Sequence, residues 1–162
     1  MKVTMKDRIS VMVQTHIVQA TTKPYINNEM LVRTIQSSHD KLGLEDAKYY
    51  IYIDKAMEVI YPDLFKDYYD AIKSQISNEL SHINVDIVED RQHLMRGSWW
   101  HMIDNCDTPY FLFLEHDWEF VENIPTVDII DNMDKYEHFN YLRFPYTYMG
   151  PGGPSHWDSH DG

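Results

Sequence analysis

The sequence predicts a single compact α/β domain whose mostly parallel β-sheet is covered by helices on both faces. Two observations support this fold class. Short apolar segments of strand length alternate along the chain with longer stretches in which apolar residues recur at helical spacing. Strands that are separated by helices of this length form parallel sheets, because the chain must cross back over the sheet before the next strand begins. The 162 residues suffice for one such domain with its own core.

The first half of the chain contributes two strands and two helices to this prediction. Residues 9–15 (ISVMVQT) are typical of a buried strand. Residues 25–42 show helical spacing, and Gly43 follows them as a stop signal. Residues 49–54 (YYIYID) are rich in β-forming side chains, which predicts the second strand. Residues 62–80 begin with a proline, which suits the first turn of a helix.

The second half continues the alternation. Residues 83–88 (INVDIV) alternate apolar and polar positions and predict a third strand, and residues 91–105 predict a helix. Residues 110–114 (YFLFL) lack any charge, which is typical of a strand buried on both faces. Residues 126–136 predict one more helix. Residues 140–148 (NYLRFPYTY) predict a strand that its proline confines to an edge or an end of the sheet.

Composition narrows the class of function. The net charge is −12, from 14 basic and 26 acidic residues, so nucleic acid and anionic membranes are not expected partners. No apolar run of about 18 residues exists, and the first residues lack the apolar region of a secretion signal. We therefore expect a cytoplasmic protein without a membrane span. A single cysteine, Cys106, excludes an internal disulfide and a cysteine-based zinc site.

Polar residues follow the predicted strands where each strand ends. Thr15 and His16 come at the end of the first strand, Asp54 ends the second, and Glu115 and Asp117 follow the apolar strand. Because the carboxyl ends of parallel strands share one edge of a sheet, and ligands bind beyond that edge, these residues are candidates for one site.

Glu115 and Asp117 are the strongest candidates. They are two residues apart, so in extended backbone their side chains would point to the same side. Two neighbouring carboxylates repel each other unless a proton or a cation lies between them, and oxygen ligands favour Mg²⁺ or Mn²⁺. An acidic protein can also hold a diphosphate through such a cation. The alternative is a pair of solvated acids in a turn after the strand, since short acidic patterns often match by chance.

Three segments resemble the GT-A glycosyltransferases, in particular the large family of small inverting-type enzymes. These segments are VMVQTHIVQATTKPYINNEMLVRTIQSS, YYIYID and LMRGSWWHMIDNCDTPYFLFLEHDWEF, and they cover roughly the first 120 residues. The third is the most specific, because it is similar to the family's helix, apolar strand and D-x-D motif. The resemblance implies a Rossmann-like GT-A domain that binds a nucleotide-activated sugar through Mn²⁺ or Mg²⁺.

The resemblance also implies roles for individual residues. Asp117 matches the metal-binding aspartate of D-x-D, and Glu115 stands where the family has the other aspartate, which contacts the ribose or the metal. Thr15 and His16 match the strand end beside the nucleotide base, and Asp54 matches the aspartate that recognises the base, commonly uracil. The basic residues expected at the base or the diphosphate are Arg96 and Arg91. The glutamate at 115 departs from the family pattern, which has an aspartate at this position.

The carboxyl-terminal segment offers further candidates. We expect residues 1–148 to form the nucleotide-sugar-binding domain and residues 149–162 to form its Gly-, Pro- and His-rich terminal loop. In GT-A enzymes a late histidine often completes the metal shell, which makes His160 and His156 candidate ligands. Asp158 or Asp161 could act as the general base of an inverting transferase. The alternative is a solvated terminus without such a role.

The sequence therefore predicts a metal-dependent glycosyltransferase that uses a nucleotide-diphosphate sugar, with UDP-sugar as the expected donor and an unknown acceptor. The short segment after Tyr148 leaves open a second function, a nucleotide-sugar-binding module or a weak donor hydrolase. A nucleotidyltransferase ranks third, because no glycine-rich phosphate loop follows the first strand. The sequence is compatible with a homodimer but does not decide it.

Overall fold

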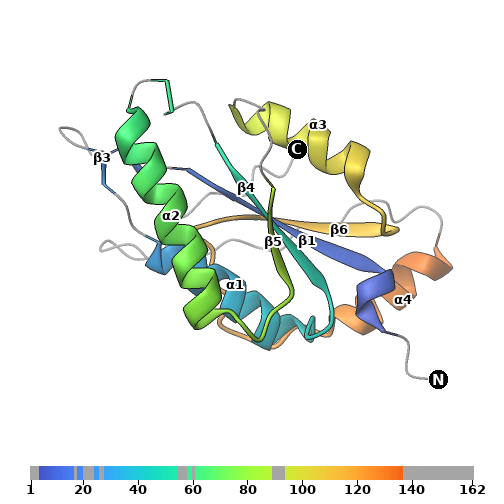
Figure 1. The fold of residues 1–162 in the computed structure, drawn as a ribbon. Coiled ribbons are helices and arrows are strands. Elements are labelled where there is room, and N and C mark those ends of the chain that lie inside the picture. Colours follow the sequence, from blue (N-terminus) through green and yellow to red (C-terminus); the bar gives the residue numbers. More distant parts are fainter. Residues whose placement is uncertain are drawn as a thin grey trace, which may run out of the picture. The chain divides into compact units, whose positions relative to one another are not determined.

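A computed structural model describes residues 4–16, 18–19, 24–25, 28–54, 58–59, 61–88 and 94–136. In these residues the protein has an α/β fold with a four-stranded, all-parallel sheet and four α-helices, a Rossmann-like arrangement (Figure 1). The chain divides into two units, Met1–Asp128 and Ile129–Gly162, and the described strands all belong to the first. The predicted domain boundary at residue 148 lies outside the described residues.

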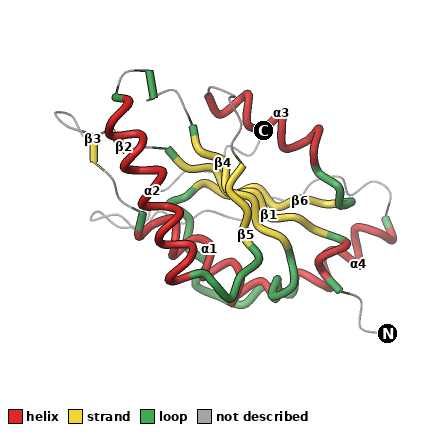
Figure 2. The backbone as a smooth tube through the Cα atoms, viewed as in Figure 1, coloured by secondary structure: helices red, strands yellow, loops and turns green. Residues whose placement is uncertain are grey.

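The described elements confirm the predicted alternation of strands and helices (Figure 2). None of the helices in the described ranges has the length and apolar character needed to cross a membrane. In chain order the elements are a short 3-10 helix Met5–Asp7, β1 Ile9–Thr15, β2 Val18–Gln19, β3 Pro24–Tyr25, α1 Glu29–Leu42, β4 Lys48–Ile53, α2 Pro62–Glu79, β5 Val85–Val88, α3 Leu94–Asn105, β6 Tyr110–Glu115 and α4 Thr126–Lys135.

Two boundaries differ from the sequence prediction by more than one residue. Helix α1 begins at Glu29 and not at residue 25, because Tyr25 pairs with Val18 in the small antiparallel β2–β3 sheet. Strand β5 begins at Val85, since the preceding residues form a turn in which the Ile83 N–H donates to the Leu80 carbonyl at 2.9 Å. The described part of α3 begins at Leu94. The strand predicted at residues 140–148 lies outside the described residues.

Gly43 ends α1 as predicted. Its φ of +63° and ψ of 39° are left-handed, a conformation that glycine adopts without the steric cost that a Cβ brings. The chain then turns toward β4, which begins at Lys48.

The strand order of the parallel sheet is β5-β4-β1-β6, so β1 lies between β4 and β6. Every residue of β1 is buried. Met12 is in register with Tyr50 on β4 and with Phe113 on β6, and Gln14 is in register with Tyr52 and Glu115. Residues in register on parallel strands have side chains on the same face, so this register assigns each side chain to one of the two helix layers.

Helices α1 and α2 cover one face of the sheet and α3 covers the other (Figure 1). On the first face, the Thr15 hydroxyl bonds to Tyr68 of α2, and Ser38 of α1 bonds to the Tyr49 hydroxyl at 3.3 Å. On the second face, Met102 of α3 packs with Met12 and Tyr52 of the sheet. Each face therefore has its own buried layer of side chains.

Strand β6 corrects one sequence prediction. The segment YFLFL was expected to be buried on both faces, but β6 is at the end of the order of the described strands and only Leu114 within it is fully buried. Phe111 is 39% exposed. Phe113 packs against α3, where its ring centroid lies 4.6 Å from that of Trp99. The segment therefore lacks charge because one of its sides packs against α3, and not because it is buried in the middle of the sheet.

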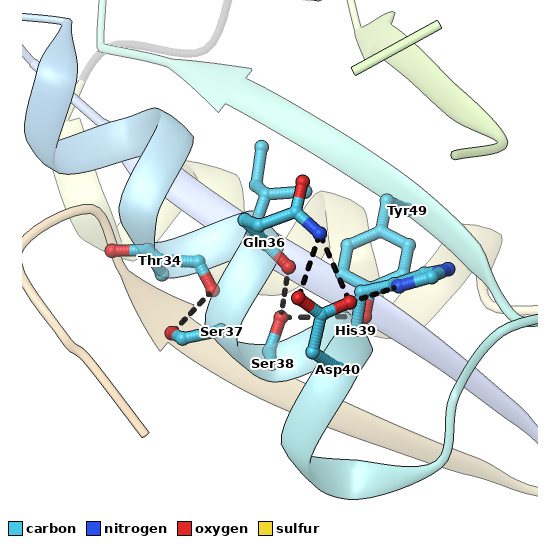
Figure 3. Close-up of polar contacts among 8 residues, drawn as sticks. Thr34, Gln36, Ser37, Ser38, His39, Asp40 and Tyr49 are labelled. Atoms are coloured by element: carbon cyan, nitrogen blue, oxygen red, sulfur yellow. Dashed lines mark hydrogen bonds and ion pairs between the residues drawn. The ribbon is translucent and has the colours of Figure 1, made fainter. Parts of the chain in front are cut away.

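Helix α1 has a row of hydrogen-bonding side chains along its length (Figure 3). The Ser37 hydroxyl donates to the Thr34 carbonyl at 3.2 Å, and the Ser38 hydroxyl donates to the Ile35 carbonyl at 2.9 Å. On the exposed side, the hydrogen bond with His39 at 2.9 Å, and after it those from Gln36, lower the pKa of the Asp40 carboxyl. The buried polar residues of this helix are thus paired with the chain around them.

Candidate functional site

The strand order identifies one position on the sheet where a ligand is expected. From β1 the chain moves outward to β4 and then β5, and it returns through α3 to place β6 on the other side of β1. In open α/β sheets, ligands bind beyond the carboxyl ends of the strands at the point where this order reverses. Here that point, the switch point, lies between the ends of β1 and β6.

The acid pair, Glu115 and Asp117, lies at the switch point. Glu115 is the last residue of β6 and is half-buried, and Asp117 is exposed. The backbone between them is not extended as expected, because residues 116–117 form a turn in which the Trp118 N–H donates to the Glu115 carbonyl at 3.3 Å. Strand alternation therefore does not put the two side chains on one side, as the sequence predicted, and a turn brings them to the same end of the strand.

Helix α1 holds the segment that follows β6, residues 116–124. The Thr34 hydroxyl donates to the His116 carbonyl at 2.7 Å, and both residues are buried. Further along, the Phe120 N–H donates to the Ser37 hydroxyl at 3.1 Å and the Ile124 N–H donates to the Lys41 carbonyl at 2.9 Å. These contacts fix the turn that bears the acid pair against a helix of the core.

His16 and His116 meet between the two strand ends. Their rings are 4.6 Å apart between centroids, in an edge-to-face arrangement at 72°. His16 is exposed, whereas His116 is 4% exposed and its Nδ1 has no hydrogen-bond partner in the described part of the protein. Burial is the main cause that lowers the pKa of His116, and repulsion from His16 lowers it further, while the negative charge of Asp117 opposes both. The imidazole is therefore mostly neutral near pH 7.

Thr15 and Asp54 are neighbours at the ends of β1 and β4. The Asp54 N–H donates to the Thr15 carbonyl at 2.9 Å, and Asp54 is half-buried. The Thr15 side chain is fully buried, and its hydroxyl bonds to Tyr68, whose own hydroxyl donates to the His16 carbonyl at 3.2 Å. Thr15 thus helps to fix the end of β1, and its predicted contact with a nucleotide remains a prediction.

Two polar residues at the switch point, Gln14 and His116, were not among the site residues predicted from the sequence. Gln14 is 3% exposed and is in register with Glu115, and its Oε1 has no hydrogen-bond partner among the described residues. The signal was present in the segment ISVMVQT, where one amide interrupts an apolar strand just before its end. His116 stands between the two acids in the sequence, and its contact with His16 depends on the pairing of β1 with β6.

The remaining candidates are only partly described. Arg96 lies in the first turn of α3, and that helix follows the carboxyl end of β5. Arg91, and with it the terminal candidates His156, Asp158, His160 and Asp161, lie outside the described residues.

The acid pair can be tested against the ion that the resemblance implies. Mg²⁺ and Mn²⁺ are usually held by one or two carboxylates, with water and substrate phosphate in the other positions. Glu115 and Asp117 supply this number, and no described side chain forms an ion pair with either of them. No group of three or more His, Cys, Asp or Glu side chains in the described ranges could hold an ion by itself. The residues therefore fit an ion that is completed by substrate and water.

Neither a known family model nor a curated protein sequence matches the chain. A function can therefore be proposed only from the geometry of the carboxyl edge and the chemistry of its residues.

Proposed function

We propose that the protein is a metal-dependent glycosyltransferase of GT-A type that binds a nucleotide-diphosphate sugar, with UDP-sugar as the expected donor. One observation carries this proposal: Glu115 and Asp117 follow β6 at the switch point of a sheet with the order β5-β4-β1-β6. A Rossmann-like sheet binds nucleotides at this point, and the two acids supply oxygen ligands for the cation that a diphosphate needs.

The charge of the protein supports a cation at this position. With a net charge of −12, the chain repels a free diphosphate over long distances. The described side chains around the acid pair form no ion pair with it, so its own charge is also available to a cation. A divalent ion between the acid pair and a diphosphate would remove both repulsions together.

The proposed roles follow the position of each residue. Asp117 binds the ion directly, and Glu115 binds the ion or the ribose. His16, exposed at the end of β1, and Asp54, at the end of β4, lie on the base side of the nucleotide. Arg96 lies in the first turn of α3, whose amino-terminal N–H groups favour negative charge and so suit a phosphate.

The chemistry needs few reacting groups from the protein. The acceptor hydroxyl forms a bond to the anomeric carbon of the sugar, the bond from that carbon to the diphosphate oxygen breaks, and the nucleoside diphosphate leaves with the electron pair. A bound Mn²⁺ or Mg²⁺ stabilises the negative charge that develops on this leaving group. The residues of the edge orient the donor, and Asp158 or Asp161 would take the proton of the acceptor.

Calorimetric titration with UDP, in the presence and absence of Mn²⁺, tests the proposal. We expect binding by the wild type only with Mn²⁺, and a loss of that binding in Asp117→Ala. Asp107→Ala is the matched control, because Asp107 is also an exposed acid but lies before the amino end of β6 and so away from the switch point.

UDP binding that needs neither Mn²⁺ nor Asp117 would contradict the proposal. Incubation of the protein with Mn²⁺ and a UDP-sugar then separates transfer from the second candidate function. Transfer to an added acceptor supports the glycosyltransferase, whereas slow release of free sugar without transfer supports a binding module or weak hydrolase.

A further inference from the structure

Gln14 is a buried amide that the proposed roles above do not use. It is 3% exposed, and its Oε1 has no hydrogen-bond partner in the described part of the chain. Buried polar side chains are normally paired, and an unpaired amide oxygen in a folded protein often marks the place of a bound ion or water. The position of this oxygen therefore matters more than its burial alone.

The register of the sheet places Gln14 beside the acid pair. On β1 it is in register with Glu115 of the parallel neighbour β6 and with Tyr52 of β4. Its side chain is consequently on the same face as that of Glu115, one residue before the end of β1 and at the end of β6. On this face Met12, Tyr52 and Met102 form the next layer, and no described residue forms a hydrogen bond to the amide oxygen of Gln14.

The two side chains together form a set of oxygen donors. An amide oxygen and a carboxylate placed side by side in a partly buried position repel each other, because both carry negative charge on oxygen. A proton donor could pair with the amide alone, but it would leave the Glu115 carboxylate unneutralised. A hard divalent cation satisfies both, and Gln amide oxygens are ordinary ligands of such ions.

We infer that Gln14 is a ligand of the cation at the acid pair, so that the ion lies between β1 and β6 and is bound by both strands. The inference rests on the proposed function only for the identity of the second partner, a nucleoside diphosphate. The donor set Gln14, Glu115 and Asp117 contains only oxygen, which favours Mg²⁺ or Mn²⁺ over ions that prefer nitrogen or sulfur.

The test is a titration of the whole chain with Mn²⁺ alone, in which electron paramagnetic resonance reports the free ion. Gln14→Leu removes the oxygen at nearly constant size, and we expect Mn²⁺ binding to weaken at least about tenfold. Gln14→Glu keeps an oxygen donor and adds charge, so it should bind Mn²⁺ at least as tightly as the wild type. Gln75→Leu is the matched control, because Gln75 on α2 also has an unpaired buried Oε1 but lies away from the acid pair.

A second readout separates a ligand from a packing residue. Without Mn²⁺, Gln14→Leu should have a higher thermal unfolding midpoint than the wild type, because an unpaired buried oxygen has been removed. With saturating Mn²⁺ the wild-type midpoint should rise more than that of Gln14→Leu. A role in packing alone would give the two proteins the same rise with Mn²⁺.

The outcomes distinguish this inference from the proposed function. Equal Mn²⁺ affinity of Gln14→Leu and Gln75→Leu, or weakened binding by Gln14→Glu, overturns the inference and leaves the glycosyltransferase proposal in place. Tight Mn²⁺ binding that depends on Gln14, without any binding of UDP, supports the ion site and removes the proposed function. A wild type that binds Mn²⁺ neither alone nor together with UDP overturns both.

Discussion

At the scale of single residues, Tyr68 of α2 holds the carboxyl end of β1 in place by hydrogen bonds. Its hydroxyl is buried, accepts from Thr15 and donates to the His16 carbonyl at 3.2 Å. Burial raises the pKa of Tyr68 from 10.0 to about 12, although the Thr15 hydroxyl opposes this by stabilising the phenolate. The buried Tyr49 has a pKa that burial raises in the same direction.

These raised pKa values predict a loss of stability in alkali. A tyrosine whose pKa is higher in the folded protein contributes stability that is complete below its unfolded pKa and is lost as pH rises through its folded pKa. For Tyr68 this window is from 10.0 to about 12. We expect the free energy of unfolding of the wild type to fall across this window, and that of Tyr68→Phe to fall less steeply, by up to about 1.4 kcal/mol per pH unit.

Urea unfolding at a series of pH values measures this difference. At pH 7 Tyr68→Phe should already be less stable by roughly 1–2 kcal/mol, because the His16 carbonyl and the Thr15 hydroxyl lose a partner. Parallel curves for the two proteins between pH 10 and 12 would show that folding does not raise the pKa of Tyr68.

Residue roles were predictable from sequence only where they depend on type and order. The acids after YFLFL stand out because two carboxylates close an apolar strand. The contacts of Gln14 and His116 depend on which strand pairs with β1, and that pairing joins segments far apart in the sequence. The burial of Thr15 against Tyr68 depends on how α2 packs, which no local pattern reveals.

At the scale of elements, the contact of α1 with residues 116–124 is the main support of the acid pair. Thr34, Ser37 and Lys41 lie on one side of α1, and each bonds to the segment after β6. The carbonyl that Thr34 holds belongs to His116, the residue between the two acids. The position of the acid pair therefore depends on the position of α1.

This dependence predicts an effect of Thr34→Val on ion binding. The substitution keeps the shape of the side chain and leaves the buried His116 carbonyl without its donor, so we expect a loss of roughly 1–2 kcal/mol in unfolding free energy. We also expect weaker Mn²⁺ binding, because the turn that bears the acid pair is no longer fixed. Urea unfolding and a Mn²⁺ titration measure the two effects.

Ser37→Ala is the control for this prediction. It removes the partner of the Phe120 N–H but leaves the His116 carbonyl bonded to Thr34. It should therefore destabilise the protein with a smaller change in Mn²⁺ affinity. Equal losses of affinity in the two variants would mean that the bond to His116 has no special role in the ion site.

The elements themselves were largely predictable, and the errors have physical causes. The helices and strands follow local periodicity, and Gly43 marked the end of α1. The predicted start of α1 was wrong because Tyr25 pairs with Val18 in a strand, and the helical spacing of the apolar residues does not reveal that pairing. The prediction that β6 is buried on both faces was wrong, because an uncharged segment looks the same in the sequence whether its strand lies in the middle of a sheet or at the end of the strand order.

At the scale of the whole molecule, net charge sets the conditions for ligand binding. The net charge of −12 attracts cations to the surface and repels diphosphates. Salt screens such long-range effects, and the screening distance falls from about 30 Å at 0.01 M to about 10 Å at 0.1 M ionic strength.

We therefore expect Mn²⁺ binding to weaken as sodium chloride rises across this range, while metal-free UDP remains poorly bound at low salt. Titrations at several ionic strengths, with the ion measured directly, give the dependence. An affinity that does not change with salt would mean that the charge of the molecule as a whole does not contribute to ion binding, and that the local ligands alone determine it.

The fold class was predictable at this scale, but the switch point was not. Alternating strands and helices indicate a parallel sheet whichever way the strands are ordered. The reversal between β1 and β6 depends on α3 crossing to the other face, and the sequence of α3 does not specify that direction. A shared carboxyl edge could thus be inferred from the sequence, but not which of its loops are neighbours.

The strand order also has a consequence for how the protein acquires its structure. Strand β1 pairs early in the chain with β4, but its other partner, β6, begins only at Tyr110, about a hundred residues later. Closing so long a stretch of chain costs entropy before any contact compensates for it, and pairings of this kind form slowly. Gln14 and Glu115 can meet only when that last pairing forms, so refolding molecules should regain most of their helix before they can capture an ion.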